Sequence, residues 1–242
     1  MEKENRNMTI GVTILSRYNS SRLPGKALKE INGKTILQYI FERVNKVLPA
    51  EQIIIATSTE KSDDIISRYC EKQNWNCYRG SLENVAKRFY ESGVNLAVDY
   101  IIRINGDNLF LDIPLLENLI NLAHTGKCDF ISNVKGRSYP KGMSIEIVRL
   151  EHYKNLLKEI ITEERYREHV TLYLYENELK SYHFVYNDEL KELAGTQLAI
   201  DTLEDFEKAI TIINSFDQDH IKYNIKEIAE IISQNQYGER RI

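Results

Sequence analysis

The chain has 242 residues, of which 42% are hydrophobic, so it can bury the core of one α/β domain with an appendage. Its net charge of −4 disfavours a nucleic-acid scaffold, because an acidic surface repels a phosphate backbone. No apolar run approaches the roughly 20 residues of a membrane helix, and no early stretch has the pattern of a signal peptide. We therefore expect a cytoplasmic protein without membrane insertion.

Strands and helices alternate in the first half of the chain. After a polar tail at residues 1–7, the apolar run TIGVTIL predicts a buried first strand. The runs QIIIATS, NCYRG and DYIIRI predict further strands, and helical periodicity predicts helices from Thr35, near 63–74, at 83–96 and from Pro114. This alternation predicts an α/β fold with a mainly parallel twisted sheet flanked by helices, and ligands at the carboxyl ends of its strands.

The pattern changes from about Ser138. The segment KGMSIEIV predicts a strand, residues 163–177 a helix and SYHFVYN another strand, which together suggest an inserted lid or dimerisation element at about 138–186. The run QLAID then predicts a strand that ends in an aspartate, followed by two helices centred near residues 208 and 228. We expect a single domain over residues 1–242.

A basic loop follows the first predicted strand. Residues 16–26, SRYNSSRLPGK, carry Arg17, Arg22 and Lys26 and no acidic residue, and Ser20 and Gly25 let backbone N–H groups turn inward. These features predict a phosphate cradle, and the alternative is a solvated surface loop.

The triplet Gly33-Lys34-Thr35 imitates the end of a phosphate-binding GxxxxGK[ST] loop. The required first glycine would fall at Leu28, and the triplet does not follow the first buried strand. We therefore interpret it as a turn that caps the helix from Thr35.

Two aspartates are candidates for a magnesium site. Asp107 lies in NGDN after DYIIRI, and Asp201 ends QLAID, so both fall at predicted carboxyl ends of strands. Each has an ordinary explanation: Asp107 suits a turn, and Asp201 with Glu204 suits a helix cap. Their shared edge favours a two-carboxylate metal site.

Four residues of the appended region are weaker candidates by themselves. His169 is consistent with a structural histidine on a helix, and Glu146 with the solvent face of a strand. Tyr139 and Gly142 are consistent with a turn.

Several motifs in order resemble the cytidylyltransferases of the spore-coat polysaccharide type, which are relatives of the enzymes that make CMP-activated ketodeoxyoctonate and sialic acid. The motifs are SRYNSSRLPGKAL, ATS, YRGS, RINGDNLFLD, SYPKGMSIEIV, ERYREHVTLYLY and LAIDTLEDF. The resemblance implies a Rossmann-like nucleotidyltransferase fold and transfer of a cytidylyl group from CTP to a small sugar-like acceptor. It also implies Mg²⁺ as cofactor and a homodimer.

The resemblance implies roles for individual residues. Arg17, Lys26 and Asp107 would be catalytic, and Asp107 and Asp201 would bind the metal ion. The nucleotide-binding residues would be Leu15, Ser16, Arg17, Ser20, Arg22, Lys26, Thr57, Ser58, Arg79, Gly80, Ser81, Asn105 and Gly106. The acceptor-binding residues would be Tyr139, Gly142, Glu146, Glu168 and His169.

The sequence departs from the family pattern near the expected acceptor pocket. Asn108 and Leu109 replace a small residue and proline, while Lys141, Ser144 and Asn84 stand where relatives often have an acid. These departures predict either a different, more anionic acceptor or weaker chemistry. Two other functions stay open: a glycosyltransferase that uses a nucleotide sugar, and a noncatalytic nucleotide-binding module.

Overall fold

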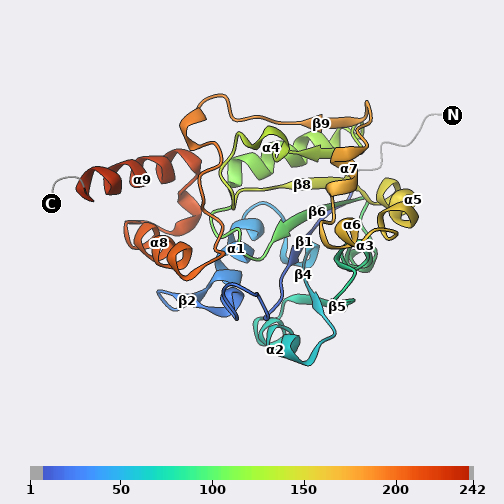
Figure 1. The fold of residues 1–242 in the computed structure, drawn as a ribbon, viewed down its shortest axis with the longest axis horizontal. Helices are drawn as coiled ribbons and strands as arrows, with labels where there is room; N and C mark the ends of the chain where they lie inside the picture. Colours follow the sequence, from blue (N-terminus) through green and yellow to red (C-terminus); the bar gives the residue numbers. More distant parts are fainter. Residues whose placement is uncertain (1–7, 240–242) are drawn as a thin grey trace.

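A seven-stranded sheet forms the centre of the computed structural model, which describes residues 8–239 (Figure 1). The strands lie in the order β5-β4-β1-β6-β8-β7-β9. Neighbouring strands pair in parallel except β8, which runs antiparallel to both β6 and β7. The mainly parallel α/β sheet is confirmed. The polar tail predicted at residues 1–7 lies outside the described residues.

The strands of this sheet are short and apolar. Their bounds are β1 (Ile10–Leu15), β4 (Ile53–Ser58), β5 (Asn76–Gly80), β6 (Tyr100–Asn105), β7 (Phe130–Ser132), β8 (Glu146–Arg149) and β9 (Tyr182–Phe184). Among them β1, β4 and β6 are almost wholly buried, which explains why they are continuous apolar runs. A separate hairpin of β2 (Glu30–Ile31) and β3 (Lys34–Thr35) precedes the first helix.

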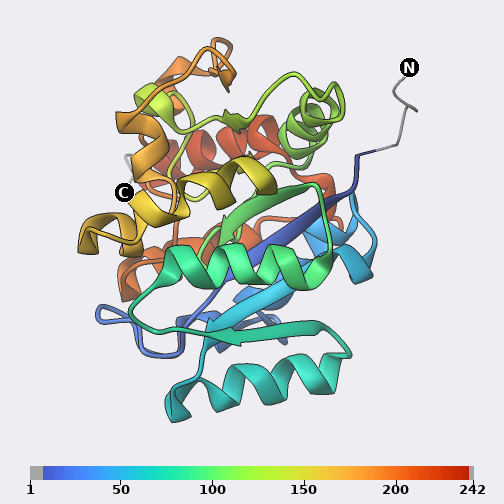
Figure 2. The same ribbon diagram turned by 90° about the vertical axis from the view of Figure 1, so that its right-hand side faces the viewer.

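Helices cover both faces of the sheet (Figure 2). One face carries α1 (Ile36–Asn45), α2 (Asp64–Gln73), α4 (Ile113–His124), α8 (Leu203–Asn214) and α9 (Ile225–Glu239), whose apolar side chains form one core. The other face carries α3 (Val85–Leu96), α5 (Leu150–Ile160), α6 (Glu164–Glu168) and α7 (Leu172–Glu176), which form a second core. The parallel strands therefore have both faces covered.

The Gly33-Lys34-Thr35 triplet forms the predicted turn and cap. Asn32 and Gly33 have φ of 51° and 78° and turn the hairpin between β2 and β3. The Thr35 hydroxyl then accepts a hydrogen bond from the backbone N–H of Gln38 at 3.0 Å and caps α1.

Two predictions about the second half are wrong, and two elements were missed. Residues 163–177 form two short helices, because the backbone leaves the helical region at His169, with φ −95° and ψ 61°. QLAID is not a strand: it makes one isolated bridge, between Gln197 and Lys141. The short strand β7 and the amphipathic helix α5 were not predicted.

The element predicted at about 138–186 is continuous with the main sheet. Its strand β8 lies between β6 and β7, and β9 forms the sheet edge beside β7. Its helices α5, α6 and α7 lie over the same face as α3. No helix among the described residues is long and apolar enough to cross a membrane.

Candidate active site

The ends of three parallel strands meet at the start of the basic loop. The backbone N–H of Ser16 donates to the Ala56 carbonyl at 3.1 Å, and that of Gly106 donates to the Leu15 carbonyl at 2.8 Å. A Cβ on Gly106 would lie 2.9 Å from the Ser16 side chain, so only glycine permits this close approach of the NGD turn. The loop and Asp107 are thereby placed side by side.

The basic loop folds back on itself before Lys26. Gly25, with φ of 71°, donates its N–H to the Tyr18 carbonyl at 2.7 Å. The Tyr18 N–H in turn donates to Asp63 Oδ1 at 2.7 Å, and Asp63 also accepts hydrogen bonds from the backbone and hydroxyl of Ser58. Ser58 therefore supports the loop from behind through Asp63.

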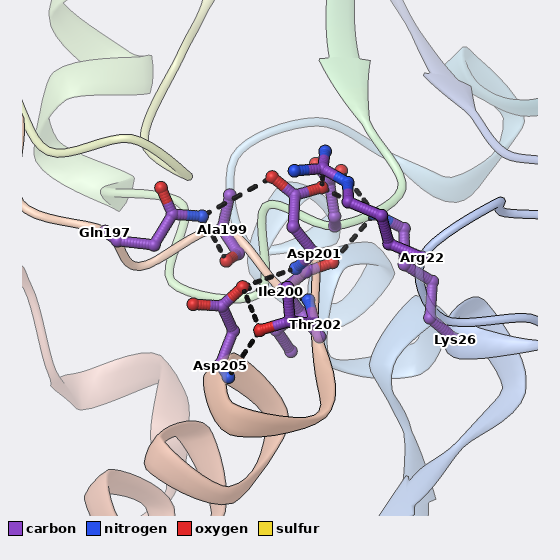
Figure 3. Close-up of polar contacts among 9 residues, drawn as sticks. Arg22, Lys26, Gln197, Ala199, Ile200, Asp201, Thr202 and Asp205 are labelled. Atoms are coloured by element: carbon purple, nitrogen blue, oxygen red, sulfur yellow. Dashed lines mark hydrogen bonds and ion pairs between the residues drawn. The ribbon is translucent and has the colours of Figure 1, made fainter.

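Lys26 joins the two predicted metal ligands. Its Nζ lies 2.8 Å from Asp107 Oδ2 and 3.2 Å from Asp201 Oδ1, and it also donates to the Ile200 carbonyl at 2.7 Å. Arg22 Nη2 lies 2.9 Å from the same Asp201 oxygen. Figure 3 shows Arg22 and Lys26 converging on Asp201. The structure thus brings together two carboxylates 94 positions apart, on either side of one cation.

This donor set fits a magnesium ion. Two carboxylates and a backbone carbonyl already converge on one cation, the Lys26 ammonium, and Mg²⁺ prefers such hard oxygen ligands. The described residues contain no cluster of three or more His, Cys, Asp or Glu side chains suited to a metal. Mg²⁺ usually binds one or two carboxylates and completes its shell with water and substrate phosphates, so two aspartates suffice.

Asp201 is positioned by a segment that crosses beneath the site. The backbone N–H of Leu198 donates to the Lys141 carbonyl at 2.9 Å, and that of Ile200 donates to the Asp107 carbonyl at 3.2 Å. These bonds replace the strand predicted for QLAID. The predicted capping pair of Asp201 with Glu204 is also wrong, because Thr202 and Asp205 form the capping box of α8 and Asp205 accepts the Asp201 N–H at 3.0 Å.

Two adjoining cavities open over this cluster. The first, about 370 Å³, is lined by the basic loop and the start of α3, and the second, about 690 Å³, by the segment around Lys141 and by α7. The cavities share a rim made of Arg22, Arg103, Asn105, Asp107, His169 and Asp201. Two ligands bound side by side would meet at this rim.

The first cavity collects most of the predicted nucleotide-binding residues. It is lined by Leu15, Ser16, Arg17, Ser20, Arg22, Lys26, Asn105, Gly106 and Asp107. Thr57, Ser58, Arg79, Gly80 and Ser81 line neither cavity. Arg79 is instead paired with Asp64 at 2.7 Å and donates to the Ser58 carbonyl at 3.0 Å, which fixes the ends of β4 and β5.

The predicted acceptor-binding residues are divided among three places. Gly142, Glu146 and His169 line the second cavity, and Glu168 lines the first. Tyr139 does not join them: it lines a separate hollow of about 270 Å³ beside α4. The unusual residues Asn108, Lys141 and Ser144 do line the second cavity, whereas Leu109 is buried in the core and Asn84 caps α3.

Glu146 is a counterion inside the protein. Its side chain is 2% exposed, pairs with Arg103, and accepts hydrogen bonds from Thr171 at 2.7 Å and Tyr175 at 2.6 Å. Burial alone would raise the pKa of Glu146, but Arg103 and the two hydroxyl donors outweigh it and hold the pKa below its usual range. Both carboxylate oxygens are occupied, so Glu146 orients Arg103 at the shared rim, and the solvent-facing role considered for it is wrong.

Two arginines at the site were not predicted. Arg103 lies on β6 between the two cavities, and Arg88 lies on α3 against the first cavity. In the sequence, Arg103 is a charged residue that interrupts the apolar run DYIIRI. This interruption was the signal that could have marked it as a site residue. Arg88 falls among helix positions with no local mark of its burial.

Comparisons with known proteins agree with this geometry. Residues 12–239 match the family model described as cytidylyltransferase. An uncharacterised protein of Methanocaldococcus jannaschii is 31% identical over 93% of this chain and 90% of its own length. The spore coat polysaccharide biosynthesis protein SpsF of Bacillus subtilis is 32% identical over 80% of this chain and 82% of its own. The structure of a cytidylyltransferase from Leptospira borgpetersenii superposes with a TM-score of 0.87 at 28% identity, covering 95% of this chain and 96% of that one.

Proposed function

This chain belongs to the cytidylyltransferase family and is a nucleotidyltransferase, and we propose that it transfers a cytidylyl group from CTP to a small sugar-like acceptor. The observation that carries the proposal is the shared rim, where the first cavity, lined by the basic loop, meets the second cavity beside Asp107 and Asp201. CTP would occupy the first cavity and the acceptor the second. Their reacting atoms would then meet at the rim.

The reaction balances as a single displacement. An acceptor oxygen attacks the α-phosphorus of CTP, the new P–O bond forms as the bond to pyrophosphate breaks, and the acceptor proton passes to solvent. The products are a CMP-linked acceptor and pyrophosphate. Arg17 and Lys26 would neutralise the negative charge that grows on the departing pyrophosphate.

Magnesium is part of the proposal. Asp107 and Asp201 would hold the ion, which supplies positive charge to the phosphates and orients them when bound. For this to happen the Lys26 ammonium leaves the two carboxylates it contacts at 2.8 and 3.2 Å. Lys26 would then be free to bind the phosphates, and the two aspartates would hold the ion in its stead.

The acceptor belongs to the sugars, sugar acids or polyol phosphates. Arg137 and Lys141 line the second cavity and have no ion pair with any described carboxylate, which favours an anionic acceptor. The relationship to SpsF supports a place in surface polysaccharide or glycan biosynthesis. A homodimer formed through residues of the 138–186 element is part of the same proposal, and light scattering after size exclusion measures it.

Pyrophosphate release tests the proposed reaction. The four nucleoside triphosphates are incubated with Mg²⁺ and a panel of sugar acids and polyol phosphates, and we expect pyrophosphate only with CTP and one acceptor class. Release of a nucleoside diphosphate from a nucleotide sugar would identify a glycosyltransferase instead. CTP binding without turnover on any acceptor would identify a noncatalytic binding module.

A further inference from the structure

Two arginines are fully buried among the residues whose burial the structure describes, and they differ in their hydrogen bonds. Arg43 on α1 and Arg88 on α3 are each 1% exposed. Arg43 donates through Nε to the Leu111 carbonyl at 2.6 Å, through Nη1 to the His220 carbonyl at 2.5 Å and through Nη2 to the Tyr223 carbonyl. All three nitrogens of Arg43 are used by the fold, so its role is structural.

Arg88 leaves most of its donors unused. Within residues 8–239 its guanidinium makes one hydrogen bond, from Nη1 to the Ser81 carbonyl at 2.5 Å, while Nε has no partner. No described carboxylate lies within ion-pair distance of it. Burial, followed by the neighbouring charge of Arg17, lowers the pKa of Arg88 to about 10, and the Asp63 carboxylate offsets only part of this shift. A buried cation with spare donors beside another cation favours an anion.

The fold makes room for this arginine. Gly80 ends β5 where a Cβ would lie 2.9 Å from Arg88 Cγ, so the absent side chain lets the arginine stem pass along the strand end. Arg88 lines the first cavity together with Arg17, whose charge acts on it. Gly80 and Ser81 thus act on the site through Arg88, although neither lines a cavity.

The cations of the first cavity fall into two groups. Lys26 and Arg22 are already paired with Asp107 and Asp201 at the shared rim. Arg17 and Arg88 have no ion pair within the described part of the chain, and neither lines the second cavity. An anion held by Arg17 and Arg88 would therefore lie away from the point of transfer.

We propose that Arg88, together with Arg17, binds the phosphates of the nucleotide that are not transferred and so holds the departing pyrophosphate. This inference rests on the proposed function for the identity of the ligand. Arg88 supplies a planar set of donors suited to phosphate oxygens, fixed in direction by its packing and by its bond to Ser81. Arg17, exposed on the loop, closes on the same phosphates from the solvent side.

Binding of inorganic pyrophosphate to the whole protein tests the proposal. Calorimetric titration, with and without Mg²⁺, compares the parent with Arg88→Met, Arg88→Lys and the matched buried control Arg43→Met. We expect Arg88→Met to weaken pyrophosphate binding by about 10- to 100-fold. Arg88→Lys should weaken it less, because lysine keeps the positive charge but lacks the planar set of donors of the guanidinium. The Lys variant also serves if the Met variant does not fold.

Thermal unfolding separates a binding role from a structural one. Without ligand, Arg88→Met should unfold near the parent temperature, because the loss of one hydrogen bond is offset by the removal of a buried charge. With pyrophosphate, its unfolding temperature should not increase as that of the parent does. Arg43→Met should have a clearly lower unfolding temperature than the parent without ligand. Where this variant is folded, pyrophosphate should still raise its unfolding temperature.

The outcomes distinguish this inference from the proposed reaction. Parent-like pyrophosphate affinity in both Arg88 variants would overturn the inference, even if CTP were turned over normally. Arg88-dependent pyrophosphate binding in a protein that releases none from CTP would uphold the anion site and overturn the proposed function.

Discussion

At the residue scale, one lysine contacts both candidate metal ligands. Lys26 contacts Asp107 and Asp201 together, which brings two carboxylates to one positive charge, and these are the residues that would hold the proposed Mg²⁺.

Neutralising either aspartate should slow the reaction. We expect Asp107→Asn and Asp201→Asn to lower turnover by about 10²- to 10³-fold, the loss typical of a single preorganised electrostatic group. Initial rates of pyrophosphate release, measured over a range of Mg²⁺ concentrations, give the result. Asp129→Asn is the control, because Asp129 pairs with Arg149 outside both cavities. Near-parent rates in Asp107→Asn and Asp201→Asn would contradict the proposed metal site.

Removing Glu146 should destabilise the fold. Glu146→Ala leaves the Arg103 guanidinium without its buried counterion, so the free energy of unfolding should fall by about 3–5 kcal/mol. Tyr175→Phe deletes one of the hydrogen bonds to the same carboxylate and should cost about 1 kcal/mol. Urea unfolding of both variants measures the difference, and equal losses would contradict the counterion role.

At the element scale, two short segments without regular structure set the floor of the second cavity. Residues 140–142 and 196–201 run together through the bridge between Lys141 and Gln197, and the second of them leads to Asp201. Gly142 has φ of 96°, and a Cβ there would lie 2.5 Å from the Ala199 nitrogen and 2.6 Å from the Leu198 carbonyl carbon. Gly142 therefore holds the two segments together by close backbone contact, and it also lines the second cavity.

Two glycines of this region make a matched pair. Gly195 also has a positive φ, 70°, but a Cβ on it would meet nothing within 4 Å. Gly195→Ala should therefore cost only the backbone strain, about 1–2 kcal/mol. Gly142→Ala adds a collision with backbone atoms, so it should be the more destabilising variant and should also slow turnover by displacing Asp201. Urea unfolding and pyrophosphate release measure both effects, and equal behaviour of the two variants would contradict this account.

At the scale of the whole molecule, a polar cluster joins the segment between α8 and α9 to α1. Arg43 donates to the carbonyls of His220 and Tyr223, and His220 Nε2 lies 2.7 Å from Glu42 Oε2. Burial lowers the pKa of His220 and outweighs the hydrogen bond to Glu42, which raises it, while Arg43 and Lys34 lower it further. The imidazole is therefore neutral in the folded protein at neutral pH.

This cluster predicts a loss of stability in mild acid. Below the unfolded histidine pKa of about 6.5, the unfolded chain takes up a proton that His220 does not take up in the folded protein. The contribution of His220 to stability is therefore fully present above that pH, and it is lost as the pH falls toward the lowered pKa of the folded state. Glu42, whose pKa is lowered in the fold, extends the loss to lower pH. His220→Gln should flatten the fall in unfolding temperature between pH 7 and 5, whereas the exposed-site variant His124→Gln should retain the parent slope.

The sequence alone determined the features that depend on neighbouring residues. Strand patterns predicted β1, β4, β5 and β6, helical periodicity predicted α1 to α4, and the Thr35 cap lies where it was expected. The basic loop and Asp107 were also correct in place, because each follows directly on a strand end. Such features rest on hydrogen bonds and side-chain alternation within a few residues, which the order of residues already specifies.

Only the tertiary structure decided how distant residues combine. Asp201 reaches Asp107 through irregular backbone where a strand was predicted, and Glu146, considered for the solvent face of a strand, is buried against Arg103 in the wall of the second cavity. Arg88 and Arg43 are indistinguishable by sequence, yet one satisfies backbone carbonyls and the other faces a cavity. Burial and partners depend on which segments the sheet order places together, and no local pattern along the chain encodes that order.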